Sequence, residues 1–247
     1  MSRIPRQCFE GEYFHLMEQG INREFIFEKD KDKKIFLNIL LKKIENTKNK
    51  ICAYCIMDNH VHILLKSNEI NDVTKVIQRT NTSYAIYYNS SRNRVGYVFR
   101  DRYRAEPIHD QFHLENCIRY IHNNPLEAGI INNLKEYKFS SYNDYMYGRI
   151  DLELIKEIYG TANFEEYKDK ISGSYDDCNF IDVDNQFGRQ NLEQFDEVCR
   201  KYSKLDYSNK DNVKKVSLEL RKRCGVKHEK VIDFMGIPAS TYYRKIK

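Results

Sequence analysis

Residues 57–65 have the sequence MDNHVHILL, which places two histidines inside a run of apolar side chains. Successive side chains of a β-strand point to opposite faces, so His60 and His62 share one face while Val61 and Ile63 share the other. Two imidazoles side by side suit a metal site. They also suit a hydrogen-bonded polar strip at the edge of a hydrophobic core, and the strand alone does not separate these two interpretations.

The segments around this strand predict a fold of alternating strands and helices. Extended segments are expected in 12–27 (around a turn at Gly20), in 51–67 (two strands joined near Asp58-Asn59) and in 96–108 (a strand or a basic hairpin arm). Apolar residues recur with a helical period in 30–48, 70–90 and 110–130. This order predicts the α+β class, with a ferredoxin-like β-α-β-β-α-β antiparallel sheet and an added helix. The last helix is expected to end near Asn124, because Pro125 disfavours a helical conformation of its predecessor.

Charge divides the chain into three parts. The net charge is +5 for residues 1–149, −9 for 150–199 and +9 for 200–247, a pattern that favours a polyanionic partner. We expect the main domain at 1–148, an acidic connector at 149–189 and a basic helical tail at 190–247. Residues 226–247 resemble a helix-turn-helix, with one helix ending near Met235-Gly236 and a second opening at Ser240-Thr241.

The composition excludes several classes of protein. A hydrophobic content of 41% with 13% aromatic residues supports a packed core. No run of about 18 apolar residues occurs, so we expect no membrane span, and the first residues lack the apolar stretch of a signal peptide. Seven cysteines at scattered spacing suit a reducing compartment, and Cys52 and Cys55 are expected to be buried thiols. A cytoplasmic, nucleoid-associated protein is the corresponding expectation.

A second motif, in the helix at CIRYIHNNP, can complete a site with the histidine strand. Tyr120 and Asn124 are four residues apart and therefore share a helix face. If that face packs beside the strand, His60, His62 and the Asn124 amide oxygen could hold one divalent ion, although Asn123 is adjacent and Asn124 could instead cap the helix. A tyrosine one turn from such an ion is suited to attack a phosphate that the ion polarises.

The combination of these motifs resembles the single-tyrosine HUH transposases, and most closely the REP-associated tyrosine transposases. The resemblance spans roughly residues 10–148 and rests on GINREFIF, HVHILL, GYVFRDRYRAEPI and YIHNNPLEAGI; Gln19-Gly20 stands where relatives often have Arg-Gly. It implies that Tyr120 is the nucleophile and that His60, His62 and Asn124 bind Mg²⁺ or Mn²⁺. It further implies cleavage of single-stranded, hairpin DNA to leave a 5′-phosphotyrosine and a free 3′-OH, in a monomer or a homodimer.

Basic residues are the candidates for DNA contacts. The set comprises Arg79, Arg92, Arg94, Arg100, Arg102, Arg104, Arg244 and Lys245. Arg100, Arg102 and Arg104 alternate, so on a strand they would share a face and could grip phosphates, although a solvated edge strand has the same pattern. Tyr84, Tyr87 and Tyr88 could stack on bases, but their helical spacing assigns at least some of them to the core.

Two other classes of function fit parts of the pattern. A non-catalytic DNA-binding regulator derived from a transposase would not need His60, His62, Tyr120 and Asn124 together. A histidine-triad nucleotide hydrolase would need a third alternating histidine, and position 64 is Leu. The sequence therefore favours a metal-dependent tyrosine strand transferase over both alternatives.

Overall fold

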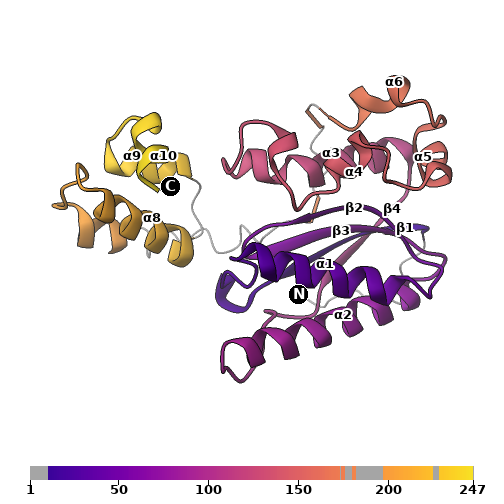
Figure 1. The fold of residues 1–247 in the computed structure, drawn as a ribbon, viewed down its shortest axis with the longest axis horizontal. Coiled ribbons are helices and arrows are strands. Elements are labelled where there is room, and N and C mark those ends of the chain that lie inside the picture. Colours follow the sequence, from indigo (N-terminus) through magenta and orange to yellow (C-terminus); the bar gives the residue numbers. More distant parts are fainter. Residues whose placement is uncertain (1–10, 173, 176–179, 182–196, 225–227, 247) are drawn as a thin grey trace. The chain divides into compact units, whose positions relative to one another are not determined.

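The computed structural model describes residues 11–172, 174–175, 180–181, 197–224 and 228–246 (Figure 1). The chain divides into two compact units, one formed by Met1–Glu127 and Ile131–Asp182 and the other by Ala128–Ile130 and Val183–Lys247. None of the helices in the described ranges combines the length and the apolarity that crossing a bilayer requires.

The first unit is built on a four-stranded antiparallel sheet. Its strands are β1 (Tyr13–Gln19), β2 (Lys50–Ile56), β3 (His60–Lys66) and β4 (Arg104–Ile108), in the spatial order β2-β3-β1-β4. The two central strands, β1 and β3, come from distant parts of the sequence. With the helices between them, this order confirms the predicted ferredoxin-like β-α-β-β-α-β arrangement.

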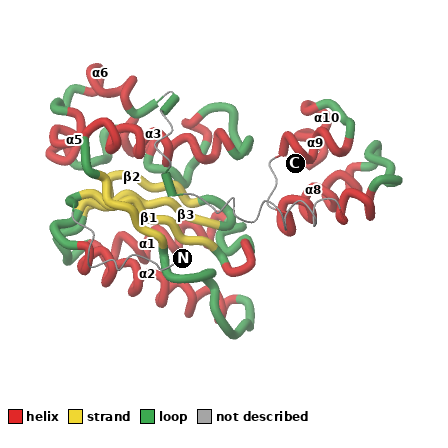
Figure 2. The backbone as a smooth tube through the Cα atoms, turned by 180° about the vertical axis from the view of Figure 1, so that it is seen from behind, coloured by secondary structure: helices red, strands yellow, loops and turns green. Residues whose placement is uncertain are grey.

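Helices cover both faces of this sheet. Helices α1 (Asp30–Ile44) and α2 (Ile70–Ser91) pack on each other along one face, and α3 (Gln111–Glu127) packs on β2 and β3 from the other (Figures 1 and 2). A strand with both faces covered buries every side chain, which explains the nearly continuous apolar run of β3. The two histidines of that run are buried with their neighbours.

Helix α3 continues past the residue where the sequence predicts its end. The helix runs to Glu127 and includes Pro125, so the expectation that it stops near Asn124 is wrong. Proline removes one backbone donor, and near the end of a helix that loss affects a single bond. The side-chain amides of Asn123 and Asn124 donate to the carbonyls of Arg119 and Tyr120 at 2.8 and 2.9 Å, which adds bonds in the same turn.

The strand predicted at 96–108 forms only over its last third. Phe99 pairs with Gly20, and the next pair is Arg104 with Met17. Residues 100–103 therefore lie opposite only two residues of the neighbouring strand β1 and must loop outward. Arg100 and Arg102 do not share a strand face with Arg104, and that part of the prediction is wrong.

The segment after α3 packs back onto the first unit. It contains α4 (Tyr142–Met146), α5 (Leu152–Tyr159) and α6 (Phe164–Tyr167), with short 3-10 turns at Leu134–Glu136 and Lys168–Lys170. The Ile56 amide donates to the Phe139 carbonyl, and the Ser141 amide donates to the Tyr54 carbonyl, each at 2.9 Å. These bonds attach the segment to the edge strand β2, and α5 packs on α3. Part of the predicted acidic connector thus belongs to the first unit.

The second unit is a small helical bundle. Its described helices include α8 (Lys210–Cys224), α9 (His228–Met235) and α10 (Ala239–Ile246), and residues 197–202 are helical as well. Their core includes Val216, Leu220, Val231, Met235 and Tyr242, and the Tyr242 hydroxyl contacts the Ser217 hydroxyl at 2.6 Å. Gly236 ends α9 with φ of 62°, a conformation that glycine adopts easily. Helices α9 and α10 agree with the helix boundaries predicted within 226–247.

Candidate active site

His60 and His62 lie on the face of the sheet that α3 covers, because a tyrosine of α3 packs on the His62 ring. The two imidazoles are 5.1 Å apart between ring centroids and perpendicular, so they share a face as the alternation predicts. Directly paired residues of neighbouring strands point to the same face. The pairs on this face are His15–Leu64, Met17–His62 and Gln19–His60 between β1 and β3, and His15–Glu106 and Met17–Arg104 between β1 and β4.

Tyr120 projects from α3 onto the histidines. Its ring centroid lies 5.3 Å from that of His62 in an edge-to-face arrangement, and the residue is only 5% exposed. Asn124 is buried one turn further along α3. Because its amide nitrogen donates to the Tyr120 carbonyl, its amide oxygen is directed away from that carbonyl and is the atom able to accept.

Two residues that the sequence analysis did not select extend this cluster across the sheet. His15 of β1 contacts His62 through ring nitrogens 3.0 Å apart, and its other ring nitrogen lies 2.6 Å from a Glu106 carboxylate oxygen. His15 also packs edge to face on the Tyr120 ring. The alternation in YFHLMEQ places His15 on one strand face, but the pairing of β1 with both β3 and β4 is not visible in the sequence.

Two aromatic residues that follow α6 in the sequence pack on the ring of Tyr120. The Phe180 ring stacks on the Tyr120 ring with centroids 4.9 Å apart and an interplanar angle of 22°. Tyr175 packs edge to face on the same ring, and its hydroxyl bonds to Glu127. The Ile181 amide contacts both Glu106 oxygens at 3.3 Å, so this short segment is fixed to the sheet as well.

The donors gathered here suit a divalent ion. Burial lowers the pKa of His62 well below its ordinary value, and the nearby His60 and His15 lower that pKa further. His62 is therefore neutral at pH 7, which is the form that binds a metal. Among the described residues, no three His, Cys, Asp or Glu side chains form a metal cluster. Two imidazoles and an amide oxygen are instead a mixed nitrogen and oxygen donor set: the amide oxygen is the ligand type that Mg²⁺ and Mn²⁺ prefer, and the imidazoles suit divalent transition metals.

His122 and the two strand cysteines lie outside this cluster. His122 is fully buried; its ring nitrogens lie 2.9 Å from the Ser141 hydroxyl and 3.3 Å from the Ile171 carbonyl. Burial lowers the pKa of His122 to about 4, so it is a neutral core residue at pH 7. Cys52 and Cys55 are buried free thiols, and burial raises the pKa of both. The sequence interpretation of these cysteines is confirmed.

The predicted DNA-binding residues fall into three groups. Arg79, Arg102 and Arg244 are exposed. Arg92, Arg94 and Lys245 have partners within their own unit: Asp32 at 2.6 Å, Glu24 at 3.3 Å, and the carbonyls of Tyr207 and Ser208 at 2.8 and 2.7 Å. Arg100 and Arg104 lie beside the histidine face, since Arg100 donates to the Gln19 side chain at 3.3 Å and Arg104 pairs with Met17.

The three tyrosines of α2 that were candidates for base stacking mostly make contacts inside the fold. Tyr84 and Tyr88 are buried, and the Tyr84 hydroxyl donates to the Ile26 carbonyl at 2.5 Å. The Tyr87 hydroxyl donates to Asp32 at 2.8 Å. An exposed aromatic ring is found instead at Tyr97, which is 83% exposed on the loop before β4.

This fold and this cluster define a ferredoxin-like domain with paired strand histidines facing a helix tyrosine. Residues 8–124 match the family model described as "Transposase IS200 like". This part of the chain belongs to that family of transposases, which are DNA-cleaving enzymes.

Two solved structures are similar to the chain. One is a REP-associated tyrosine transposase bound to a REP hairpin, with 13% identity over 61% of this chain and 88% of that one, and a TM-score of 0.49. The other is a putative transposase from Deinococcus radiodurans, with 16% identity over 49% of this chain and 97% of that one, and a TM-score of 0.35. No curated protein matches the chain.

Proposed function

We propose that this transposase is a metal-dependent strand transferase that cleaves and rejoins single-stranded DNA through Tyr120. The observation that carries the proposal is the packing of the Tyr120 ring on His62, with His60 beside it on the same strand face. His60 Nδ1 contacts the Asn59 side-chain oxygen at 2.7 Å, so Nδ1 carries the proton and Nε2 carries the lone pair. The buried face thus brings nitrogen ligands and a phenolic nucleophile together.

The proposed reaction exchanges one phosphate ester for another. The Tyr120 oxygen forms a bond to phosphorus while the bond from phosphorus to the 3′ oxygen breaks, leaving a 5′-phosphotyrosine and a free 3′-hydroxyl. Tyr120 loses one proton and the departing oxygen gains one, so the step is neutral in protons. Attack by a 3′-hydroxyl on the phosphotyrosine reverses the step and joins DNA ends.

His60, His62 and the Asn124 oxygen are the residues that would hold Mg²⁺ or Mn²⁺. A bound ion polarises a phosphate oxygen and neutralises the charge that develops during attack. The chain itself contributes the orientation: α3 fixes Tyr120 and Asn124 one turn apart, and the sheet fixes the histidines opposite them. The burial of the cluster excludes water, which would compete with the tyrosine for the phosphate.

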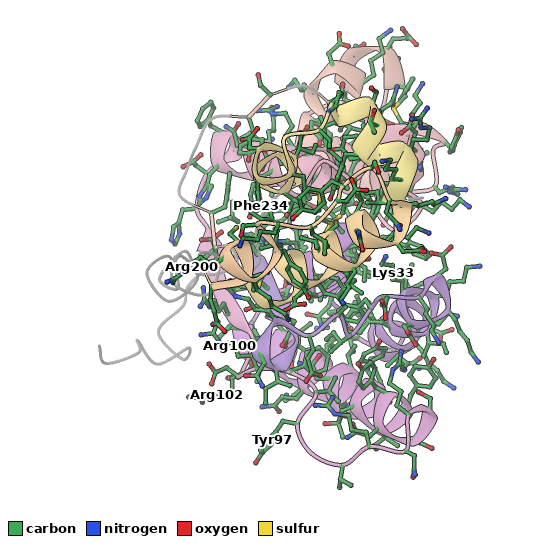
Figure 3. The ribbon with its side chains drawn as sticks, turned by 90° about the vertical axis from the view of Figure 1, so that its left-hand side faces the viewer. Lys33, Tyr97, Arg100, Arg102, Arg200 and Phe234 are labelled. Carbon is green, nitrogen blue, oxygen red and sulfur yellow. The ribbon has the colours of Figure 1, made fainter. Side chains whose placement is uncertain are left out.

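Basic side chains mark a path for the DNA backbone beside this cluster. Arg104 lies on the same sheet face as His62, and Arg100 is bonded to the neighbour of His60 in the sheet. Figure 3 shows Arg100, Arg102 and Tyr97 along one side of the first unit. Tyr97 and Arg102 also line a surface groove with Gln78 and Thr82 of α2. Phosphates could bind the arginines while a base stacks on Tyr97.

Substitution of Arg104 by Ala tests this path. We expect Arg104→Ala to weaken binding of a single-stranded oligonucleotide and to reduce the slope of log affinity against log salt by about 1. Arg149→Ala is the matched control, because Arg149 is exposed and pairs with Asp144 at the end of α4. Equal salt slopes for Arg104→Ala and Arg149→Ala, measured by fluorescence anisotropy, would place the DNA elsewhere.

Phe180 must leave the Tyr120 ring before a phosphate can reach the phenol oxygen from that side. An aromatic pair contributes about 0.5–1.5 kcal/mol beyond its buried area, and 1.4 kcal/mol corresponds to a factor of ten. We therefore expect Phe180→Ala to accelerate single-turnover formation of the covalent complex by roughly 2- to 10-fold. Phe164→Ala, which removes a ring that packs on Tyr167 instead, should leave the rate unchanged. A slower reaction in Phe180→Ala would show that the ring orients Tyr120.

The second unit is proposed to help select the DNA, with a hairpin as the form of target. Its exposed Arg244 lies on α10, the second helix of the predicted helix-turn-helix. The test of the proposed function is incubation of the whole protein with end-labelled hairpin oligonucleotides and Mn²⁺, followed by a denaturing gel. A covalent protein–DNA band supports the proposal, whereas binding without that band across a panel of hairpins supports the non-catalytic regulator.

A further inference from the structure

Three ionisable side chains form a continuous chain across three strands. Glu106 of β4 lies directly opposite His15 of β1, and a carboxylate oxygen is 2.6 Å from His15 Nδ1. His15 Nε2 lies 3.0 Å from Nδ1 of His62 on β3, with the ring centroids 5.2 Å apart and an angle of 26° between the ring planes. His15 and His62 are completely buried. The chain therefore connects the edge of the sheet to a proposed metal ligand without an intervening water.

The contacts in this chain determine which nitrogen of each ring carries a proton. A carboxylate only accepts hydrogen bonds, so His15 Nδ1 must donate to Glu106. A neutral imidazole has one donor and one acceptor, so His15 Nε2 is an acceptor. His62 Nδ1 then donates to it, and the lone pair of His62 is on Nε2. For a neutral His15, reversal of either bond would oppose two protons or two lone pairs; only a doubly protonated His15 donates to both neighbours, and it would leave the His62 lone pair on Nδ1.

We infer that His15, oriented by Glu106, is a positioning residue that holds His62 in the tautomer with its lone pair on Nε2. The inference rests on the proposed function, since it assigns a partner to one of the proposed metal ligands. Hydrogen-bonded partners of metal-binding histidines fix the tautomer and the ring orientation, and their loss typically weakens metal affinity by about 10- to 100-fold.

Glu106 is in turn held in place from outside the sheet. The Ile181 amide contacts both of its oxygens at 3.3 Å, and the adjacent Phe180 packs edge to face on His15. The segment that covers Tyr120 therefore also orders the start of the histidine chain. Through these contacts with Glu106 and His15, its effect reaches His62.

The first test measures Mn²⁺ affinity without DNA, by titration with electron paramagnetic resonance detection. We expect His15→Leu, which removes both bonds of the central ring, to weaken Mn²⁺ binding by about 10- to 100-fold. Glu106→Leu should weaken it less, since His15 remains, and Glu106→Gln should restore most of the affinity because its amide oxygen can still accept. His122→Gln is the control, because it alters a fully buried histidine that is not part of the Glu106–His15–His62 row.

The second test observes the tautomer directly, by ¹⁵N nuclear magnetic resonance of the histidine rings in the metal-free protein. The His62 signals are assigned by their loss in His62→Ala. Protonated Nδ1 in the parent protein, and a mixture of tautomers in His15→Leu or Glu106→Leu, support the inference. Circular dichroism checks the fold of each variant; if His15→Leu fails to fold, Glu106→Leu retains the histidine and still decides the question.

The two tests separate this inference from the proposed function. Protonated Nε2 on His62 in the parent protein, or unchanged Mn²⁺ affinity in both leucine variants, would overturn the positioning role. If the parent protein binds no Mn²⁺ while His62 carries its proton on Nδ1 and loses that preference in the variants, the positioning role stands and the metal in the proposed function is wrong.

Discussion

Tyr120→Phe is expected to abolish the covalent protein–DNA complex while leaving DNA affinity within about 2-fold of the parent protein. The change removes a single oxygen atom and keeps the ring that packs on His62 and Phe180. Loss of a catalytic nucleophile lowers turnover by factors of up to roughly 10⁶, so we expect strand cleavage to fall by at least about 10³-fold. The measurement is cleavage of a labelled hairpin on a denaturing gel.

The control for this prediction is a second buried tyrosine of the same unit. Tyr142 on α4 packs edge to face on His122, away from the histidine pair, and Tyr142→Phe should cleave like the parent protein. Equal loss of activity in both variants would point to a general effect on the fold. Continued cleavage by Tyr120→Phe would mean that another group attacks the phosphate.

His62→Ala is expected to have the second large effect, because it removes a proposed ligand that is completely buried. We expect Mn²⁺ affinity to fall by at least about 100-fold, beyond the loss that follows removal of a hydrogen-bonding partner of a ligand. Cleavage should fall with it, and added Mn²⁺ should restore part of the activity. Isothermal titration calorimetry and the hairpin assay measure the two effects.

His60→Ala is measured beside His62→Ala. Because His60 is 8% exposed, its loss disturbs the core less than the loss of His62. Both variants should lose metal binding, whereas His122→Gln should retain it. Thermal unfolding of all three proteins shows whether they fold. If His62→Ala is folded and binds Mn²⁺ like the parent protein, the ion is held elsewhere or is not part of the reaction.

The sequence was sufficient to predict the sheet and the meeting of His60, His62 and Tyr120 on one of its faces. Local patterns carry that information: the alternation in HVHILL gives the strand and the shared face of His60 and His62, and the spacing of Tyr120 and Asn124 gives one helix face. The element order then limits the topology to very few possibilities. The ring contact between Tyr120 and His62 agrees with that prediction.

The sequence did not reveal the features that depend on long-range pairing. His15 and Glu106 meet because β1 lies between β3 and β4. The register of this pairing cannot be predicted from either segment alone. Arg100 and Arg102 leave the strand because four residues lie opposite two, which alternation cannot show. Phe180 reaches Tyr120 from 60 positions away in the chain.

The predicted arginine and lysine contacts illustrate a further limit. The sequence shows that a charged side chain is present, but only the structure shows which groups of the protein it already contacts. Arg92 pairs with the buried Asp32, and Lys245 donates to two backbone carbonyls, so neither is a better DNA candidate than the exposed Arg79 or Arg102. Arg104 gains importance instead, because it lies on the same sheet face as His62.

The most direct test of the central claim is to locate the covalent bond between protein and DNA. The parent protein is incubated with a hairpin oligonucleotide and Mn²⁺, the DNA is digested to a short remnant, and tryptic peptides are analysed by mass spectrometry. Residues 120–135, bounded by cleavage after Arg119 and Lys135, contain Tyr120 and no other tyrosine. We predict a nucleotide adduct on this peptide, at Tyr120. An adduct on any other residue, or cut DNA with no adduct, would contradict the proposed mechanism.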